Sequence, residues 1–255
     1  MINLVDSHCH LDFQLFDIDR ANILAHCKQI GVSDIVIPGV TADKWGRLLE
    51  ICNQSELLHP AIGLHPLFMD HHTAQHLVDL KKLIATIQPV AIGEIGLDFY
   101  LPNHDKKAQI DLFTAQLNLA QSAQLPVLLH VRKAHDQTIN LLKSHPVVGG
   151  IVHAFNGSLQ QAEQYMKLGF VLGVGGVITH AKATRLRTLF SQLPLASIVL
   201  ETDAPDMPLA DMQDQRNTPE NIPIILASLT NIRSESKQDI ATITTDNAKR
   251  ILNIK

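Results

Sequence analysis

The stretch Val5-Asp6-Ser7-His8-Cys9-His10 begins at the last residue of a short apolar segment, residues 2–5. If that segment is a β-strand, side chains two residues apart point to the same side of it. His8 and His10 would then point together beyond the end of the strand. Two neighbouring imidazoles are typical of a metal site. The chain contains 14 histidines, so the motif can also arise by chance, and the metal interpretation requires further ligands elsewhere.

Short apolar segments alternate with amphipathic ones along the rest of the chain, at a spacing typical of βα units. The predicted strands are residues 2–5, 33–39, 60–66, 89–94, 126–130, 149–153, 170–174 and 196–203. The predicted helices are residues 17–30, 41–55, 73–87, 105–123, 133–144, 158–168, 181–192, 219–231 and 236–252. Strands that are apolar throughout favour a parallel sheet covered on both faces. Eight such units predict an α/β fold of the closed (β/α)8 TIM-barrel type, and a doubly wound open sheet is the structural alternative.

Length and composition agree with one barrel. The chain has 255 residues, of which 45% are hydrophobic, and it shows no long linker, low-complexity tract or break in composition. We therefore predict a single catalytic domain over residues 1–255. The net charge of −4 argues against a broad electrostatic attraction for nucleic acid. It does not argue against a small site whose positive charge comes from metal ions.

The cysteines and the first twenty residues bear on the compartment. Cys9, Cys27 and Cys52 are odd in number and lack paired spacing, which argues against a disulfide framework. Several aspartates and histidines lie where a signal peptide would be apolar. No apolar run approaches the ~20 residues that span a bilayer. We expect a cytoplasmic protein with no membrane partner, and we infer no obligate protein partner.

Most of the predicted strands end in a potential metal ligand. In a (β/α)8 barrel the active site lies at the carboxyl ends of the strands. Taken singly, each of these residues has a structural explanation, as a turn histidine, a core histidine or half of an ion pair. Of the remaining histidines, only His104 and His135 lie near strand exits. Because the candidates all fall at predicted exits and none in mid-strand, we predict one shared site formed by His8, His10, His65, Glu94, His130, His153 and Asp203.

The types of ligand indicate the chemistry. Histidines with carboxylates suit zinc, manganese, iron or nickel better than calcium. His8, His10, His130, His153, Glu94 and Asp203 are too many for one tetrahedral ion but enough for two. Two ions ~3.5–4 Å apart activate a bridging water in phosphoryl displacement. Glu94 is suited to bridge the ions, and Asp203 to complete one shell and orient or deprotonate the water.

Neighbouring residues suit supporting roles. Arg132 stands two places after His130, so it can hold a phosphate through two hydrogen bonds, although a structural salt bridge is an equal alternative. Asp98 and Glu201 are candidates to orient ligand histidines through the free ring nitrogen.

Two further pairs of residues have weaker signals. Asn156 and Ser158 fall where a helix amino terminus can receive a phosphate, but Ser158 can equally serve only as a helix cap. Arg216 and Asn217 lie in a long loop after the last strand, which either closes over substrate or is simply solvated.

Together these motifs resemble the TatD family of metal-dependent hydrolases over essentially the whole chain. The segments at residues 157–163 and 203–208 resemble its YjjV-like branch in particular. The matching motifs are Asp6-Ser7-His8-Cys9-His10, Gly63-Leu64-His65-Pro66, Gly93-Glu94-Ile95-Gly96-Leu97-Asp98, Leu129-His130-Val131-Arg132, Val152-His153-Ala154-Phe155 and Glu201-Thr202-Asp203-Ala204-Pro205.

This resemblance implies an amidohydrolase-type TIM barrel and a deoxyribonuclease that depends on magnesium or another divalent metal. It implies exonuclease action on DNA ends. It also implies that the residue matching His65 serves phosphate binding or catalysis, and that the metal ligands are His8, His10, Glu94, His130, His153 and Asp203.

Three hypotheses remain at this point. The first is phosphodiester hydrolysis at DNA ends by two divalent ions (zinc, manganese or magnesium), with Glu94, Asp203 and His65 catalytic and with His65 and Arg132 binding substrate. The second is a small-molecule amidohydrolase or phosphoesterase with the same metal centre. An aromatic content of 4% and the lack of a row of basic and aromatic residues slightly favour the second hypothesis. The third is a non-catalytic barrel, which would bind no stoichiometric metal.

Overall fold

The computed structural model describes residues 3–100, 102, 105–212 and 215–255. Its strands are β1 Leu4–Asp6, β2 Val32–Pro38, β3 Leu58–Ala61, β4 Ile92–Asp98, β5 Val127–Arg132, β6 Gly150–Val152, β7 Phe170–Val174 and β8 Ile198–Leu200. Its α-helices are α1 Arg20–Gln29, α2 Trp45–Cys52, α3 Ala74–Ile87, α4 Lys106–Ala123, α5 His135–Ser144, α6 Leu159–Lys167, α7 Thr184–Gln192, α8 Ile222–Thr230 and α9 Lys237–Leu252. Short 3-10 turns complete it: η1 Gln14–Phe16, η2 Ala42–Lys44, η3 Pro66–His71, η4 Gly176–Thr179, η5 Leu195–Ser197 and η6 Pro219–Asn221.

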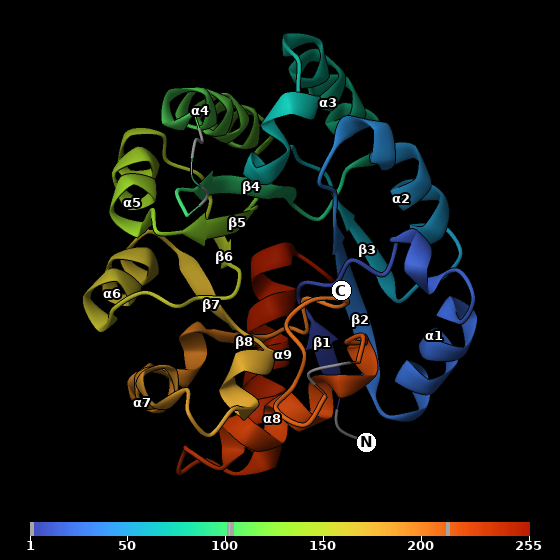
Figure 1. Ribbon diagram of the computed structural model, residues 1–255, viewed down its shortest axis with the longest axis vertical. Coiled ribbons are helices and arrows are strands. Elements are labelled where there is room, and N and C mark those ends of the chain that lie inside the picture. The colour runs from blue at the N-terminus through green and yellow to red at the C-terminus, as the bar shows by residue number, and fades with distance from the viewer. Residues whose placement is uncertain (1–2, 101, 103–104, 213–214) are drawn as a thin grey trace.

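The strands form a closed parallel barrel. Strands β1 to β3 pair in order, and so do β4 to β8. One seam between the two groups is a parallel bridge from Ala61 to Ala91. At the other seam the Ser7 amide donates to the Leu200 carbonyl at 3.0 Å. The prediction of a (β/α)8 barrel is confirmed, and Figure 1 shows the helices arranged around the strands.

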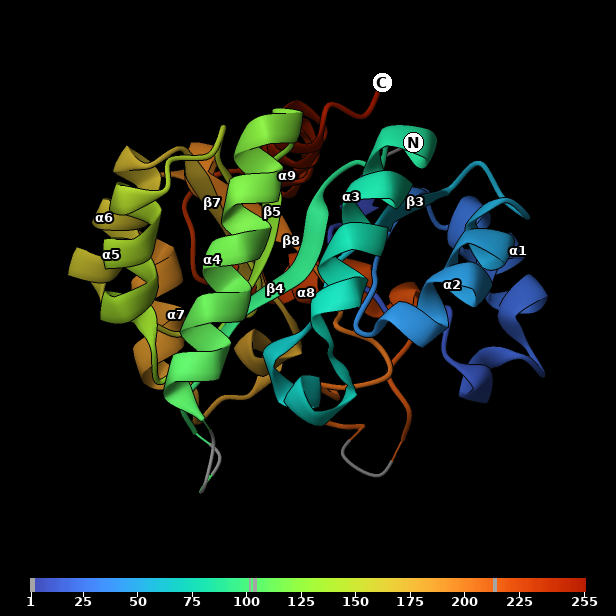
Figure 2. The ribbon, with the colours of Figure 1, turned by 90° about the horizontal axis from the view of Figure 1, so that it is seen from above.

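A layer of apolar side chains fills the amino-terminal half of the barrel. Each strand, or the residue just before it, contributes one member, and α9 covers the layer with Ala248 and Leu252. Helix α9 lies at the end of the barrel opposite the loop that follows β8 (Figure 2). The strand members are Val5, Val36, Ala61, Ala91, Leu128, Ile151, Val171 and Val199.

The same alternation of side chains delivers polar residues to the other end of the barrel. A side chain two positions after an inward-facing residue also faces inward. His130 follows Leu128 by two, His153 follows Ile151 by two, and Glu201 follows Val199 by two. The apolar layer therefore fixes which polar side chains face the carboxyl-terminal mouth.

Strand boundaries differ from those predicted at the residues that matter most. Strand β4 was predicted to end at Glu94 but continues to Asp98, and His130 is the fourth residue of the six in β5. The expectation that no candidate lies in mid-strand is therefore wrong for Glu94 and His130. The reason is pairing: Gly96 opposes His130, and Asp98 opposes Arg132, so both strands run on past the apolar segment.

Two strands, β3 and β8, end several residues earlier than predicted. Strand β3 ends at Ala61, so His65 lies beyond it as the residue before η3. Strand β8 ends at Leu200, which leaves Asp203 in the following loop. The first predicted strand included Ile2, which lies outside the described residues.

An ionic cluster ties the amino-terminal end of the barrel together. His59, expected just before the third strand, lies in β3, and its Nε2 donates to Asp34 at 2.8 Å. Lys249 of α9 pairs with Asp34 at 3.0 Å, and the Ser33 hydroxyl donates to it at 2.7 Å. Burial raises the pKa of Asp34, but the hydrogen bonds from His59, Ser33 and Lys249 outweigh it and lower this pKa to about 2. The Asp34 carboxylate thus joins β2, β3 and α9.

The three cysteines, Cys9, Cys27 and Cys52, are free and buried. In the ranges that the structure describes, no helix combines the length and the apolar character needed to cross a bilayer.

We predict that Asp34→Asn lowers the free energy of unfolding at pH 7 by about 1–3 kcal/mol, because it removes a charged acceptor of several hydrogen bonds. The pKa of Asp34 is depressed in the folded state, so its contribution is present above the unfolded pKa of about 4 and is lost as the pH falls towards 2. Urea unfolding at pH 7 and pH 3 measures this: the difference between the wild type and the variant should shrink at pH 3. Asp246→Asn, at an exposed position of α9, is the control and should change stability by less than about 0.5 kcal/mol. A difference independent of pH would contradict the prediction.

Candidate metal centre

Backbone hydrogen bonds on both sides fix the segment that carries His8 and His10. The Cys9 amide donates to a carbonyl of β2 at 3.0 Å, and the His10 amide donates to the Ala204 carbonyl at 2.7 Å. The Asp203 amide donates to the His8 carbonyl at 2.8 Å. Side chains alternate, so Cys9 packs into the apolar core while the two imidazoles turn the other way, with ring centroids 5.1 Å apart. The orientation predicted for this pair is therefore observed.

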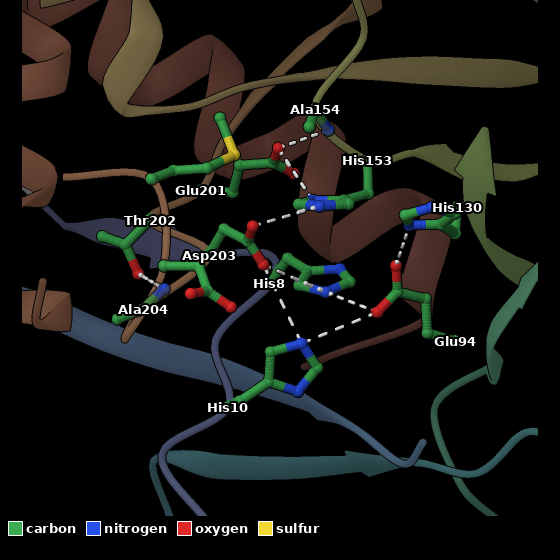
Figure 3. Close-up of polar contacts among 12 residues, drawn as sticks. His8, His10, Glu94, His130, His153, Ala154, Glu201, Thr202, Asp203 and Ala204 are labelled. Carbon is green, nitrogen blue, oxygen red and sulfur yellow. Dashed lines mark hydrogen bonds and ion pairs between the residues drawn. The ribbon is translucent and has the colours of Figure 1, made fainter. Parts of the chain in front are cut away.

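Glu94 lies between His130 on one side and His8 and His10 on the other (Figure 3). Its Oε2 is 3.1 Å from His8 Nε2 and 3.6 Å from His10 Nε2. Its Oε1 is 3.1 Å from His130 Nδ1 and 3.3 Å from His65 Nε2. Each carboxylate oxygen thus faces a different pair of ring nitrogens, which is the placement that a bridging ligand needs.

Asp203 closes the other side of the same cluster. Its Oδ1 is 3.7 Å from His8 Nε2 and 3.8 Å from His10 Nε2, and its Oδ2 is 3.5 Å from His153 Nε2. The rings of His8 and His153 stack with centroids 3.8 Å apart. Potential ligand atoms lie within 4.8 Å of one another in three overlapping groups: His8 with Glu94 and His153, His8 with His10 and Asp203, and His65 with Glu94 and His130.

Two buried carboxylates set the tautomers of the remaining histidines. Asp98 Oδ2 is 2.9 Å from His130 Nε2, and Glu201 Oε1 is 3.0 Å from His153 Nδ1. Each ring also faces a carboxylate of the cluster, since Glu94 lies near His130 Nδ1 and Asp203 lies near His153 Nε2. When a metal binds on the cluster side, the ring proton lies on the outer nitrogen, where Asp98 or Glu201 accepts it. Asp98 and Glu201 therefore stand where the sequence predicted ring-orienting residues.

His65 presents the opposite tautomer. Its Nδ1 accepts a hydrogen bond from the Leu67 amide at 3.1 Å, so in the neutral ring the proton lies on Nε2, which points to Glu94. Burial lowers the pKa of His65 and favours this neutral form. A protonated Nε2 donates a hydrogen bond and does not ligate a metal, so the geometry favours a donor role for His65 over a ligand role.

The protonation states of His10 and Glu94 suit a metal. Burial and the neighbouring His8 lower the pKa of His10 to about 4. Burial raises the pKa of Glu94, but the charges of His65 and His8 and the hydrogen bond from His130 outweigh it and hold this pKa well below its usual range. Metals bind ionised carboxylates and neutral imidazoles. Burial lowers the pKa of His130 and His153, but the neighbouring carboxylates outweigh it and raise the pKa of both rings, so a metal that binds there displaces a proton.

The charge balance gives a direct test of whether a metal fits. Glu94 and Asp203 are both largely buried, and in the described part of the chain neither forms an ion pair with a lysine or an arginine. Buried carboxylates are costly without a compensating cation. Nitrogen and oxygen donors of these kinds suit zinc or manganese. The donor set therefore fits divalent metal ions.

Cations and aromatic rings gather at the rim of the mouth. The Arg132 guanidinium lies 3.6 Å from the centroid of the Tyr100 ring, and Lys133 Nζ lies 4.9 Å from it. Lys106 Nζ is 5.1 Å from the centroid of the Phe99 ring. Among the described residues Arg132 has no carboxylate partner, so the alternative of a salt bridge is not realised there. The sequence showed no row of basic and aromatic residues because these side chains come from two separate parts of the chain. Phe99, Tyr100 and Lys106 lie just after β4 and at the start of α4, and Arg132 and Lys133 lie at the end of β5 and just after it.

Other candidates have local explanations. The Ser158 hydroxyl accepts from the Gln161 amide at 3.2 Å and caps α6. Arg216 donates to the Leu15 carbonyl at 2.7 Å and pairs with Asp19 at 2.5 Å, so it anchors its own loop. His135 lies at the start of α5, away from the cluster, and His104 lies outside the described residues.

Two residues hold the Asp203 segment, a role that was not assigned to them from the sequence. Asp6 is fully buried and accepts from the Thr202 amide at 2.9 Å and from the Thr202 hydroxyl at 2.5 Å. The Asn217 amide donates to the carbonyls of Thr202 at 2.8 Å and Asp206 at 2.9 Å. The spacing of Asp6 could have indicated a supporting role, since Asp6 precedes His8 by two residues just as Glu201 precedes Asp203. Asn217 was expected in a loop that closes over substrate or is solvated, but its side chain is buried and holds that loop together.

A glycine makes room for Glu201. A Cβ atom added at Gly173 would lie 2.1 Å from Glu201 Oε2, which is far inside contact distance. Glu201 Oε1 also accepts from the Ala154 amide at 2.6 Å. The contact between Glu201 and His153 therefore requires that residue 173 of β7 has no side chain.

Comparisons with known proteins agree with this geometry. The family model described as TatD related DNase matches residues 5–253. The chain is 40% identical over 253 residues to the uncharacterized metal-dependent hydrolase YjjV of Escherichia coli K12, covering 98% of each protein. It is 34% identical to a protein of a Rahnella species named 3'-5' ssDNA/RNA exonuclease TatD, covering 92% of this chain and 93% of that protein. The crystal structure of the Escherichia coli YjjV protein, a TatD homologue, superposes with a TM-score of 0.96 at 39% identity over 100% of both chains.

We predict that Gly173→Ala displaces Glu201 and lowers the affinity for zinc or manganese by about 10–100-fold, as expected when a residue that orients a ligand histidine is disturbed. Metal titration by calorimetry measures this, and circular dichroism checks the fold. Gly46→Ala is the matched control, because an added Cβ at Gly46 meets nothing within 4 Å. Unchanged metal affinity in Gly173→Ala would show that the position of Glu201 does not matter for the centre.

Proposed function

The chain belongs to the TatD related DNase family and is a metal-dependent hydrolase; from this premise we propose that it is an exonuclease that removes nucleotides from the ends of single-stranded DNA. We propose two divalent ions as its cofactors. The first is held by His8, His10, Asp203 and Glu94, and the second by Glu94 with His130 and His153.

The position of Glu94 carries this proposal. Its Oε2 faces His8 and His10 at 3.1 and 3.6 Å, and its Oε1 faces His130 at 3.1 Å. Such a carboxylate suits a bridge between two ions. When bound, two such ions polarise a water and neutralise the charge that develops on a phosphoryl group during displacement.

The chain's own residues have distinct tasks in this proposal. Asp203, whose Oδ1 and Oδ2 face different histidines, accepts the proton of the attacking water. His65 Nε2–H donates to a phosphate oxygen. Arg132, whose guanidinium lies over the Tyr100 ring at the rim, pairs with a phosphate of the DNA strand. Asp98 and Glu201 keep two histidine rings in orientation throughout.

Two observations support single-stranded DNA as the substrate: the activity named for a relative, and the side chains at the rim of the mouth. The activity named for the Rahnella relative supports a single-stranded DNA substrate and 3'-to-5' polarity. The cations above Tyr100 and Phe99 support it independently, since aromatic rings and positive charges together bind single strands.

A small-molecule amidohydrolase or phosphoesterase is the second candidate. The observation that favours it is a pocket beside His130 and His153 that is lined mainly by apolar side chains. The net charge of −4 points the same way.

The assay that decides uses protein stripped of metal and reloaded separately with manganese, zinc or magnesium. We expect it to release mononucleotides from end-labelled single-stranded DNA. A panel of phosphomonoesters, amides and lactones is run beside it. Hydrolysis of a member of that panel without nucleotide release under any metal would replace the exonuclease with the second candidate.

We predict that Glu94→Gln and Asp203→Asn each lower kcat by about 10²–10³-fold or more, because each removes several kcal/mol of charge stabilisation from the transition state. Elemental analysis should show less than the wild-type metal content in both variants. Glu163→Gln, on the exposed face of α6, is the control and should keep full activity. Parallel losses of Tm and activity in the two site variants would instead give these residues a structural role.

A further inference from the structure

A pocket of about 400 Å³ lies beside the metal centre, over the ends of β6 and β7. His130, His153 and Asp203 form the wall on the side of the centre. Val177, Leu186 and Met207 contribute apolar side chains to the rest of its lining. We call this space the β7 pocket. A molecule bound in it touches the candidate metal ligands directly.

Glycines account for the room in the β7 pocket. Gly173 and Gly175 lie on its lining, where other residues would place side chains. A Cβ atom at Gly175 would already reach 3.4 Å from Met207 Cε. Val177 lies on η4 and Leu186 on α7, so two separate elements after β7 enclose the space that these glycines leave open.

The lining favours an uncharged group with a polar edge. Within the described lining, the charged side chains are those of the centre and Arg132 at the rim. Asn156 adds one amide, and its Oδ1 is held 3.2 Å from His135 Nε2. The Asn156 amide NH2 is therefore the end left to face a ligand. An apolar enclosure with one amide donor suits a planar heteroaromatic ring.

We propose that the β7 pocket binds the base of the terminal nucleotide while its phosphate lies at the metal centre, with Val177, Leu186 and Met207 determining specificity. The proposal deepens the exonuclease function and rests on it. The pocket is near the lower end of the range of about 300–1,000 Å³ for small-molecule sites, which suits one nucleotide unit rather than a strand. Such a pocket admits the end of a chain and so explains removal of one nucleotide at a time.

The test compares two single-stranded oligonucleotides that differ only in the terminal residue at the digested end. One ends in a normal nucleotide and the other in an abasic tetrahydrofuran residue. In the metal-loaded enzyme, Leu186→Ala should raise KM for the normal end about tenfold and leave KM for the abasic end unchanged. Val177→Trp, at a side chain that is 39% exposed, should block the pocket and give the same pattern without disturbing the core. Leu119→Ala, another partly buried leucine but on α4, should change neither KM.

Calorimetry adds a readout that needs no turnover. The wild-type enzyme should bind deoxyadenosine monophosphate at least about tenfold more tightly than deoxyribose 5-phosphate, and Leu186→Ala should remove that difference. Equal affinity for the two ligands, with normal nucleotide release, would overturn the pocket proposal and leave the exonuclease intact. No release from either oligonucleotide would overturn the exonuclease and the pocket proposal with it.

Discussion

The backbone hydrogen bonds that join the first strand to the last are the constraint on which the centre depends. They place His8 and His10 beside Asp203, nearly 200 residues later in the chain. Asp6 strengthens the same seam, because its buried carboxylate accepts both the amide and the hydroxyl of Thr202. Closing the barrel and assembling the ligands are therefore one event. An open sheet with the same strands would leave its first and last strands, and so the two halves of this cluster, apart.

The barrel interior divides its volume between two layers. Bulky apolar side chains fill the layer nearest the amino end, and glycines with histidines and carboxylates occupy the layer above it. A Cβ at Gly93 would lie 2.5 Å from Leu128 Cβ, and one at Gly173 would meet Glu201. Small residues thus allow large polar ones to turn inward. Apolar packing is concentrated in the lower layer and in a second, larger apolar cluster. The upper layer carries costly buried charge, which the histidines and a bound cation would offset.

The sequence predicted much of this arrangement because it rests on period-two alternation and on ligand chemistry, both of which are local. His8 and His10, the barrel topology and the convergence of the seven candidates follow from such patterns. The mid-strand places of Glu94 and His130 did not, because strand length in a barrel is set by pairing with a neighbour. The group of Arg132, Lys133 and Tyr100 at the rim and the loop contacts of Asn217 also escaped prediction, since they join segments that are separate in the chain.

Helix α9 determines from which end of the barrel a molecule can reach the site. Its residues Ala248 and Leu252 cover the packed apolar layer, so the helix closes the amino-terminal end of the barrel. Any molecule that reaches Glu94 therefore enters and departs by the carboxyl-terminal mouth. Product release and substrate entry therefore use the same opening, and the product must leave before the next substrate can bind. Lys106, Arg132 and Lys133 lie at the rim of this opening and attract an anionic substrate and an anionic product alike.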